Sequence, residues 1–179
     1  MKKFVNAFDY ANTICQEMKR GILLTAAQDG KVNPMTIGWG TIGIQWGRPI
    51  FIAFVRVNRY TRQMLDATGE FTVNVPMGEF DSKILGYCGT KSGRDVDKVK
   101  ELSLTLEEPD KISVPGIAQL PLTLECKVLY QQLQDISILP QDIMDRYYPQ
   151  NVPSTATGSN QDAHIAYYGE IVSSYIIEK

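Results

Sequence analysis

The sequence is short of the residues from which metal centres and disulfide frameworks are built. It has a single histidine, His164, and three cysteines, no two of which form a Cys-x-x-Cys pair. A metal site with several histidine ligands is therefore excluded, and the odd cysteine count argues against a disulfide framework. We expect no metal cofactor and a reduced, intracellular protein.

Long hydrophobic runs are also missing. The longest, Ile50 to Val55, has six residues, whereas a bilayer-spanning helix needs about 20. The basic start at Lys2 and Lys3 meets Asn6 and Asp9 before any signal-peptide core can form. These absences predict a soluble protein in the cytoplasm with no membrane partner.

Positively and negatively charged residues are nearly equal in number. Lys and Arg number 18 against 20 Asp and Glu, for a net charge of −2. Because binding to a phosphate backbone needs a basic protein, this balance predicts no nucleic-acid partner, although it leaves room for one small basic pocket. The 179 residues suit a single domain over residues 1–179.

What the sequence does contain is a series of short β-branched runs joined by turns. An Asp29-Gly30 pair between two of these runs indicates a hairpin. Few helical patterns separate the runs, which favours a mainly β antiparallel barrel with a few short helices over a doubly wound parallel sheet. The expected strands cover residues 21–27, 32–39, 41–44, 50–55, 71–76, 122–130 and 164–175.

Four short helices are expected. Asn58 or Thr61 can cap the first, which runs through Leu65 and stops at Gly69. The others are expected over residues 79–88, 95–102 and 141–147.

Residues Gly38 to Gly43 match the dinucleotide-binding pattern G-x-G-x-x-G. That motif must open a helix and be followed about 20 residues later by an acid. Here it leads into Gly47-Arg48-Pro49 and another strand, and Gln63 stands at the acid's position. We reject the motif and interpret these glycines as strand bends or sites of close approach.

Two basic turns are better candidates for binding an anion. Arg56 to Arg62 carries three arginines directly after a hydrophobic strand, and Arg59-Tyr60-Thr61 would stand at a helix entry. Free backbone N–H groups, a guanidinium and a hydroxyl there suit a phosphate. The alternative is a solvated, charged helix start, which is the commoner outcome for such a segment.

The second basic turn, Cys88 to Lys98, combines two glycines with Lys91, Ser92 and Arg94. Glycines let backbone amides converge on an anion. The spacing fails the Walker pattern G-x-x-x-x-G-K-[ST]. A flexible loop that caps the following helix is the alternative.

His164 and Cys88 each allow two interpretations. His164 lies in a strand-like run beside Tyr167 and Tyr168, where a surface or satisfied core histidine is the more common case and a catalytic one is the alternative. Cys88 lies near Lys91 and Arg94, which would lower its pKa, although a buried, inert thiol is the more common case.

Five motifs in one order resemble the flavin reductase-like, flavoredoxin-type family of FMN-binding proteins, and the resemblance covers roughly residues 15–178. They are Asn33-Pro34-Met35-Thr36-Ile37-Gly38-Trp39, Arg59-Tyr60-Thr61, Phe71-Thr72-Val73-Asn74-Val75-Pro76, Ser92-Gly93-Arg94-Asp95-Val96-Asp97-Lys98, and His164 with Tyr168-Gly169-Glu170-Ile171.

The resemblance implies a split β-barrel homodimer that binds FMN near the subunit interface. It implies that the 33–39 segment lies along the flavin ring, that the two basic turns hold the phosphate, and that His164 lies near the ring or the nicotinamide approach. The cofactor-binding residues it implies are Asn33, Met35, Thr36, Ile37, Trp39, Asn58, Arg59, Tyr60, Thr61, Lys91, Ser92, Arg94 and Lys98.

The activity that the resemblance implies is that of an FMN-dependent oxidoreductase, an NAD(P)H:flavin reductase with hydride transfer through flavin N5. One alternative is a flavoredoxin-type protein that takes electrons from a redox protein partner. Another, of a different class, is a non-catalytic module that binds flavin or haem. The sequence assigns no role to residues 131–160.

Overall fold

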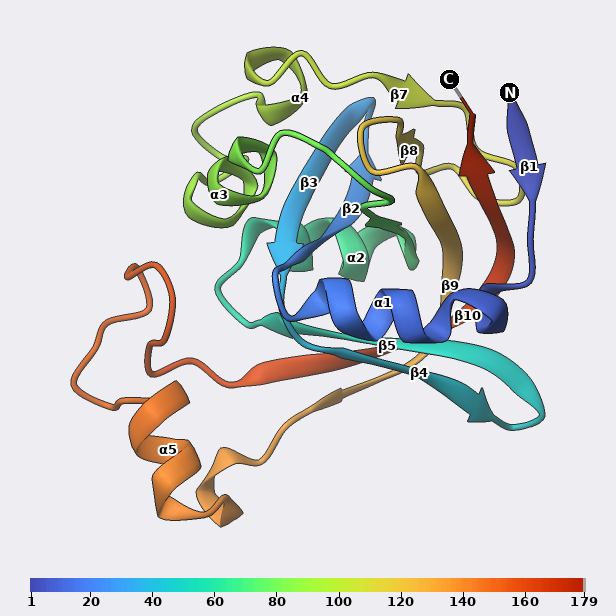
Figure 1. Cartoon of the computed structure of the whole chain (residues 1–179). Coiled ribbons are helices and arrows are strands. Elements are labelled where there is room, and N and C mark those ends of the chain that lie inside the picture. Colours follow the sequence, from blue (N-terminus) through green and yellow to red (C-terminus); the bar gives the residue numbers. More distant parts are fainter. Residues whose placement is uncertain (179) are drawn as a thin grey trace.

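The computed structural model describes residues 1–178, and most of them build or cover one curled antiparallel sheet (Figure 1). The strands are β1 (Lys2–Phe4), β2 (Ile22–Gln28), β3 (Lys31–Ile37), β4 (Gly40–Gln45), β5 (Arg48–Arg56), β6 (Glu70–Val75), β7 (Leu106–Glu107), β8 (Gly116–Ile117), β9 (Leu122–Leu133) and β10 (His164–Ile177). The helices are α1 (Ala11–Met18), α2 (Tyr60–Thr68), α3 (Lys83–Thr90), α4 (Lys98–Glu101) and α5 (Gln141–Tyr147), with 3-10 turns η1 (Ala7–Tyr10) and η2 (Ile136–Ile138).

The main sheet has the strand order β3-β2-β6-β9-β10-β5-β4, and β1 adds to the far end of β10. Every pair in it is antiparallel. The sheet curls, but its two end strands, β3 and β4, do not pair with each other in the described chain. The fold is therefore an antiparallel split β-barrel, as expected, and β7 and β8 form a separate two-stranded ribbon.

Alternate side chains of the strands fill the barrel. Leu24, Phe51, Phe71, Leu124 and Tyr167 come from five different strands and are all fully buried. A smaller apolar cluster lies under α3 and α4, on the outer side of the sheet. Strand β2 contributes to both clusters, through Leu24 on one face and Leu23 on the other, and β3 pairs with it.

Local turn chemistry sets two of the connections. Asp29 and Gly30 have φ angles of 52° and 76°, as the two central residues of a type I′ hairpin require. Gly69 ends α2 in the left-handed region, at φ 65°. Both features confirm the turn and the helix stop predicted from the sequence.

The helices differ in part from expectation. Arg59, and not Asn58 or Thr61, is the N-cap residue of α2. The helix expected over 79–88 begins only at Lys83, because the Asp81 side chain accepts a hydrogen bond from the Lys83 N–H (2.9 Å) and starts the turn there. The helix expected over 95–102 is reduced to α4, capped by Asp97, whereas α5 covers the predicted 141–147.

Helix α1 was not expected from the sequence. It lies against the barrel and buries only Ile14 and Met18, which are one turn apart. Two apolar side chains in a polar stretch are too weak a pattern for prediction.

The Gly38–Gly43 segment leads into strand β4 and opens no helix, which confirms the rejection of a dinucleotide motif. Gly40 is a site of close approach, since a Cβ there would lie 2.8 Å from Cζ of Phe51. Gly43 has open space around it.

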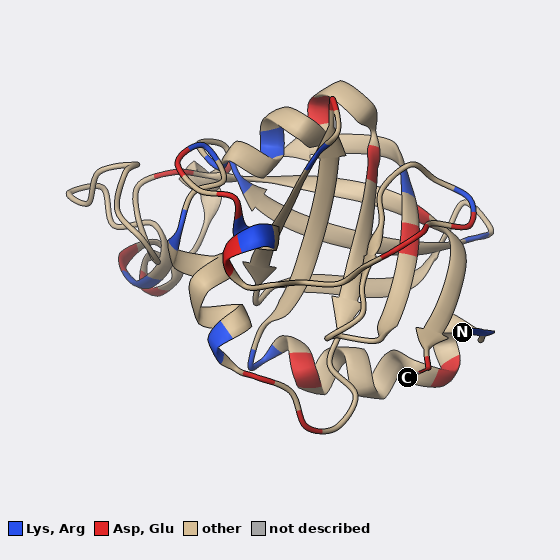
Figure 2. Ribbon diagram, turned by 90° about the horizontal axis from the view of Figure 1, so that it is seen from above, with Lys and Arg blue, Asp and Glu red and all other residues tan. Residues whose placement is uncertain are grey.

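Charged residues of both signs are interspersed over the ribbon, and no face in Figure 2 carries one sign alone. Within residues 1–178, none of the helices combines the length and the hydrophobicity that a bilayer crossing requires.

Gly169 offers a test of the barrel packing. It lies at a register shift in β10, where a Cβ would come within 2.6 Å of Cζ of Phe71 and 2.9 Å of Cβ of Cys126. We expect Gly169→Ala to lower the free energy of unfolding by about 1–3 kcal/mol, because the core must shift to accept the methyl group. Urea unfolding measures it. Gly43→Ala is the matched control, with an expected change within about 0.5 kcal/mol, and equal losses in both variants would contradict this packing.

Candidate functional site

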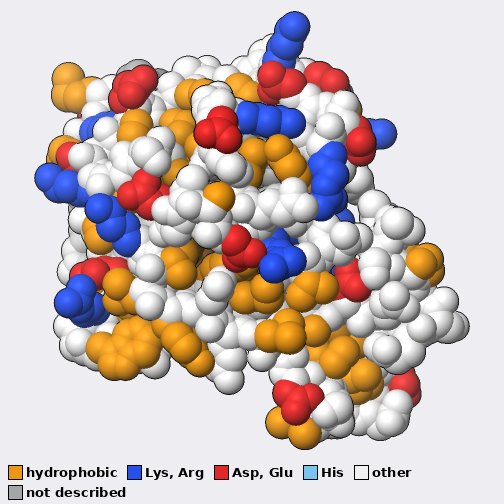
Figure 3. All heavy atoms as spheres, turned by 180° about the vertical axis from the view of Figure 1, so that it is seen from behind, with side chains coloured by type: hydrophobic (Ala, Val, Ile, Leu, Met, Phe, Trp, Pro, Cys, Tyr) orange, Lys and Arg blue, Asp and Glu red, His pale blue; other side chains and the backbone are white. Residues whose placement is uncertain are grey.

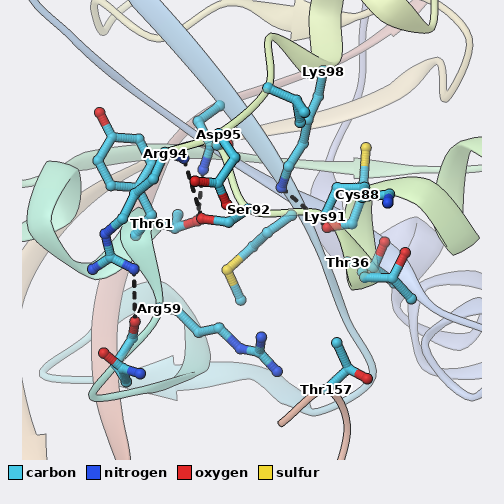
Figure 4. Close-up of a pocket in the computed structure, with 18 of the residues that line it drawn as sticks. Thr36, Arg59, Thr61, Cys88, Lys91, Ser92, Arg94, Asp95, Lys98 and Thr157 are labelled. Atoms are coloured by element: carbon cyan, nitrogen blue, oxygen red, sulfur yellow. Dashed lines mark hydrogen bonds between the residues drawn. The ribbon is translucent and has the colours of Figure 1, made fainter. Parts of the chain in front are cut away.

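A cavity of about 500 Å³, here called the basic cavity, opens where β3, the start of α2 and the loop between α3 and α4 come together. Figure 4 shows side chains from these segments directed into one space. Its lining residues are Asn33, Met35, Thr36, Asn58, Arg59, Tyr60, Thr61, Cys88, Gly89, Thr90, Lys91, Ser92, Gly93, Arg94, Asp95, Val96, Lys98, Ser154, Thr155 and Thr157.

Four positive side chains line this cavity, from Arg59, Lys91, Arg94 and Lys98, against one carboxylate, that of Asp95. Within residues 1–178, none of the four forms an ion pair with a carboxylate within 4 Å. Positive groups left without partners around one space attract an anion. The cavity therefore has the electrostatics of an anion site.

Arg59 joins this charge to the end of a helix. As the N-cap residue of α2 it has extended backbone, at φ −71° and ψ 138°, and the first backbone N–H groups of α2 follow it. Burial lowers the pKa of Arg59, and the Asp162 charge opposes this effect. Helix N-termini and guanidinium groups both suit phosphate, which supports the sequence-based interpretation of this turn.

Lys98 is the most buried of the four, at 3% exposure. Its Nζ donates to the carbonyls of Pro34 (2.9 Å) and Cys88 (3.1 Å), so it ties β3 to the end of α3. Burial lowers its pKa to about 8. Two neutral acceptors leave this charge without a counter-ion, and an anion in the cavity would supply one.

Arg94 holds the two basic turns together. Its Nη1 donates to the carbonyl of Asn58 (3.3 Å), and its guanidinium lies 5.5 Å from the centre of the Tyr60 ring. Lys31 lies 4.9 Å from the same ring and donates to the Gly93 carbonyl. The two turns, far apart in sequence, thus form one wall.

Gly93 permits this contact. A Cβ at Gly93 would lie 2.1 Å from Oδ1 of Asn33, so only glycine fits. The Asn33 side chain donates through Nδ2 to Oγ1 of Thr61 (2.8 Å), and its Oδ1 is buried without a hydrogen-bond partner among the described residues. Asn33 thereby links β3 to the first turn of α2.

A second, smaller cavity of about 280 Å³, here called the ring cavity, adjoins the first and shares Met35, Thr36 and Arg59 with it. It continues along the end of β3 to Trp39 and His164. Its lining residues are Met35, Thr36, Ile37, Gly38, Trp39, Phe54, Arg56, Arg59, Tyr147, Gly158, Ser159 and His164.

His164 is buried in the wall of the ring cavity, at 6% exposure. Its Nδ1 lies 2.9 Å from the hydroxyl of Tyr148, and its ring centre lies 4.8 Å from that of Trp39. Burial, with the positive charges of Arg56 and Arg59, lowers its pKa to about 3. His164 is therefore a neutral, oriented imidazole at neutral pH.

The loop between α5 and β10 supplies residues that the sequence did not reveal. Ser154, Thr155 and Thr157 line the basic cavity, and Gly158 and Ser159 line the ring cavity. The sequence showed a polar surface loop here, without any pattern that pointed to a partner.

Arg56 holds the loop between α5 and β10 in place. It is buried, and its guanidinium donates to the carbonyls of Asn160, Asp162 and Tyr147. Burial lowers the pKa of Arg56, as it does that of Arg59. The roles differ in their hydrogen bonds: Arg56 donates to backbone carbonyls and holds the loop, whereas Arg59 lines the basic cavity.

Every residue that the sequence nominated lines one of the two cavities. Asn33, Met35, Thr36, Asn58, Arg59, Tyr60, Thr61, Lys91, Ser92, Arg94 and Lys98 line the basic cavity, and Ile37, Trp39 and His164 line the ring cavity.

Two of these side chains form hydrogen bonds within the protein. The Asn58 amide donates to the Ser154 carbonyl (3.2 Å) and so ties the α5–β10 loop to the turn. Ser92 Oγ accepts the Arg94 N–H (3.1 Å) and shapes its own loop. These contacts make both residues supports of the cavity wall.

Cys88 is buried, and burial raises its pKa to about 11 despite the opposing charge of Lys98. The reactive-thiol interpretation of Cys88 is therefore wrong, and the inert one is confirmed.

The model of the flavin reductase-like domain matches residues 16–178. The chain belongs to the flavin reductase-like family. An uncharacterized protein of Archaeoglobus fulgidus is 35% identical to this flavin reductase-like chain over 99 residues, or 55% of either protein, so the match spans about half the length of that relative.

Two solved structures share the fold of this family member. Flavoredoxin from Methanosarcina acetivorans superposes with a TM-score of 0.63 at 24% identity, covering 88% of this chain and 68% of that one. An FMN-binding domain of a flavin reductases-like enzyme from Shewanella baltica superposes with a TM-score of 0.66 at 16% identity, covering 98% and 77%. Both likenesses support the split barrel.

The single histidine permits a direct test of the ring cavity. With its pKa at about 3, we expect the imidazole C–H resonances of His164 not to shift between pH 5 and 8 in NMR spectra. In the unfolded chain the same group titrates near 6.5.

Because the unfolded chain then binds more protons, the free energy of unfolding falls as pH drops from about 6.5 towards 3. His164→Gln is expected to lose this part of the pH dependence. A midpoint near 6.5 in the folded protein would show that the side chain is solvated.

Proposed function

We propose that this chain is an FMN-dependent oxidoreductase of the NAD(P)H:flavin reductase type, acting as a homodimer in the cytoplasm through a single FMN-binding domain over residues 1–179. The observation that carries this proposal is the basic cavity, whose positive side chains have no carboxylate within 4 Å among residues 1–178, directly beside a cavity walled by aromatic rings.

The basic cavity fits the phosphate of FMN. Arg59 and Lys91 carry positive charge, the first turn of α2 presents N–H groups, and Thr61 adds a hydroxyl. Lys98 adds a buried charge from the opposite side. A dianionic phosphomonoester would meet the charge that the protein leaves unpaired.

The ring cavity fits the planar part of the cofactor. Met35, Ile37, Phe54 and Trp39 give apolar walls, and the β3 backbone borders the same space. A mostly apolar site with a few polar groups is typical of cofactor binding.

When bound, FMN supplies the hydride and electron transfer chemistry, and the protein supplies binding, orientation and exclusion of water. His164 is held through Tyr148, and among the described residues its other ring nitrogen forms no hydrogen bond. Because it is neutral, it can donate or accept one hydrogen bond at the ring cavity without adding charge there.

The homodimer is supported by an exposed apolar face. Ile44 is 73% exposed, Trp46 56% and Tyr130 46%. Trp46 and Tyr130 lie edge to face with their ring centres 6.4 Å apart. Hydrophobic side chains gather along the lower part of the view in Figure 3. Such a patch is typical of an interaction surface, here that of a second copy.

Arg59 provides the test of the phosphate site. We expect Arg59→Ala to weaken FMN binding about tenfold to a hundredfold, since a charge-assisted contact contributes about 1.5–3 kcal/mol. Titration calorimetry with FMN measures this, and riboflavin, which has no phosphate, is expected to lose little affinity.

Arg62→Ala is the matched control for Arg59→Ala. Arg62 lies on the same helix, pairs with Asp66 (2.9 Å) and does not line either cavity. An equal loss of FMN affinity in both variants, or none in either, would place the phosphate elsewhere.

Anaerobic mixing with a nicotinamide tests the activity itself. We expect the yellow band of the FMN-loaded protein to bleach within seconds when NADH or NADPH is added. A protein that binds FMN but is reduced only by a redox protein would instead be a flavoredoxin-type carrier. A preparation that takes up no FMN would remove every flavin-based proposal.

A further inference from the structure

A third cavity, of about 490 Å³, lies between α1, the end of β9 and α5, and is here called the α5 cavity. It borders the ring cavity, because Gly38, Trp39, Phe54 and Tyr147 line both. Its remaining lining residues are Cys15, Met18, Lys19, Gly40, Gln134, Leu139, Ile143 and Tyr148.

Aromatic rings form the side of the α5 cavity that faces the ring cavity. The Trp39 and Tyr147 rings meet edge to face, with centres 5.1 Å apart and an interplanar angle of 87°. Leu139 and Ile143, from the segment of η2 and α5, also line the α5 cavity. Flat, apolar walls of this kind favour a planar aromatic ligand.

The charge of the α5 cavity has one sign. Among the residues that the structure describes, Lys19 is its single charged lining residue, and no Asp or Glu lines it. In the described chain, the Lys19 ammonium donates to the Gln16 side-chain oxygen (3.1 Å) and pairs with no carboxylate within 4 Å. The charge is complementary to a ligand with one negative group at its rim.

We propose that the α5 cavity binds an aromatic carboxylate of one or two rings, seated against Trp39 with its carboxylate at Lys19. The shared wall places this ligand beside the ring cavity. Its role as a second substrate there rests on the proposed flavin function, whereas its binding does not.

The experiment uses 1-naphthoate as the probe, titrated by calorimetry into the full chain with and without FMN. Naphthalene-1-carboxamide and 1-naphthylmethylamine have the same rings but are neutral and cationic. Binding is expected in the order naphthoate, amide, amine. Equal binding of all three, or no binding of naphthoate, would overturn the proposal.

Two variants locate the site. Lys19→Gln is expected to weaken naphthoate about threefold to tenfold, as an exposed ion pair allows, and to leave the amide unchanged. Lys100→Gln, which changes an exposed lysine on α4 outside the cavity, is the matched control, with no expected change in naphthoate binding.

A second variant, Ile143→Trp, is expected to fill the α5 cavity and abolish binding of both naphthoate and the amide. Unchanged binding in Lys19→Gln and Ile143→Trp would overturn the assignment.

The same samples separate the two proposals. If FMN binds and naphthoate does not, the α5 cavity proposal alone fails. If naphthoate binds and FMN does not, the proposed function fails and the cavity remains. A second copy of this chain is the other possible occupant of the α5 cavity. Sedimentation at each protein concentration used in the titrations gives the oligomeric state and so tests for it. If naphthoate binds only the monomer, the cavity belongs to the interface between copies and the proposal is wrong.

Discussion

The arrangement of the site depends on positive charge that, among residues 1–178, has no carboxylate partner within 4 Å. Arg59 and Lys98 approach the basic cavity from different elements, and the positive charge of Arg59 adds to the effect of burial in lowering the pKa of Lys98. Burying a charge costs free energy unless something compensates it. The carbonyls of Pro34 and Cys88 compensate Lys98 in part, and a bound anion would complete that compensation. A ligand that binds only the native state then adds to its stability by mass action.

Because these positive charges remain available for an anion, the hydrogen bonds around the basic cavity connect its loops to one another and leave its interior open. Arg94 and Asn58 donate across the gaps between turns, to the Asn58 and Ser154 carbonyls respectively. Arg56 does the same for the loop before β10. These donors hold the backbone of the loops in place, and Arg59 and Lys91 keep their charge directed at the cavity. The overall net charge of −2 is no obstacle, because the relevant field is local.

The sequence predicted the parts of this site that depend on local rules. The Asp29-Gly30 hairpin, the stop of α2 at Gly69 and the basic turn at Arg59 follow from turn and capping preferences that act within a few residues. The prediction did not reach the loop with Ser154 and Thr157, because backbone carbonyls accepting from Arg56 hold it, and carbonyls are the same in every sequence.

Nor could the sequence show that Arg56 holds a loop whereas Arg59 lines the basic cavity. The two arginines are three residues apart in one turn, but Arg56 ends β5 on the loop side and Arg59 begins α2 on the cavity side. That change of direction comes from the strand-to-helix turn, in which the Arg59 N–H donates to the Arg56 carbonyl (3.0 Å). Sequence alone shows a cluster of charge, whereas the turn decides which charge is structural and which is left for a ligand.

Trp39 lines two neighbouring cavities, the ring cavity and the α5 cavity. It lies between the end of β3 and the start of β4 and is 38% exposed, and its ring contacts those of both His164 and Tyr147. Gly40 beside it can follow this path only because it has no Cβ to strike Phe51. Gly40, one of the glycines that imitate a dinucleotide motif in the sequence, thus has a packing role: it lets the chain pass the barrel beside Trp39, whose indole borders both the ring cavity and the α5 cavity.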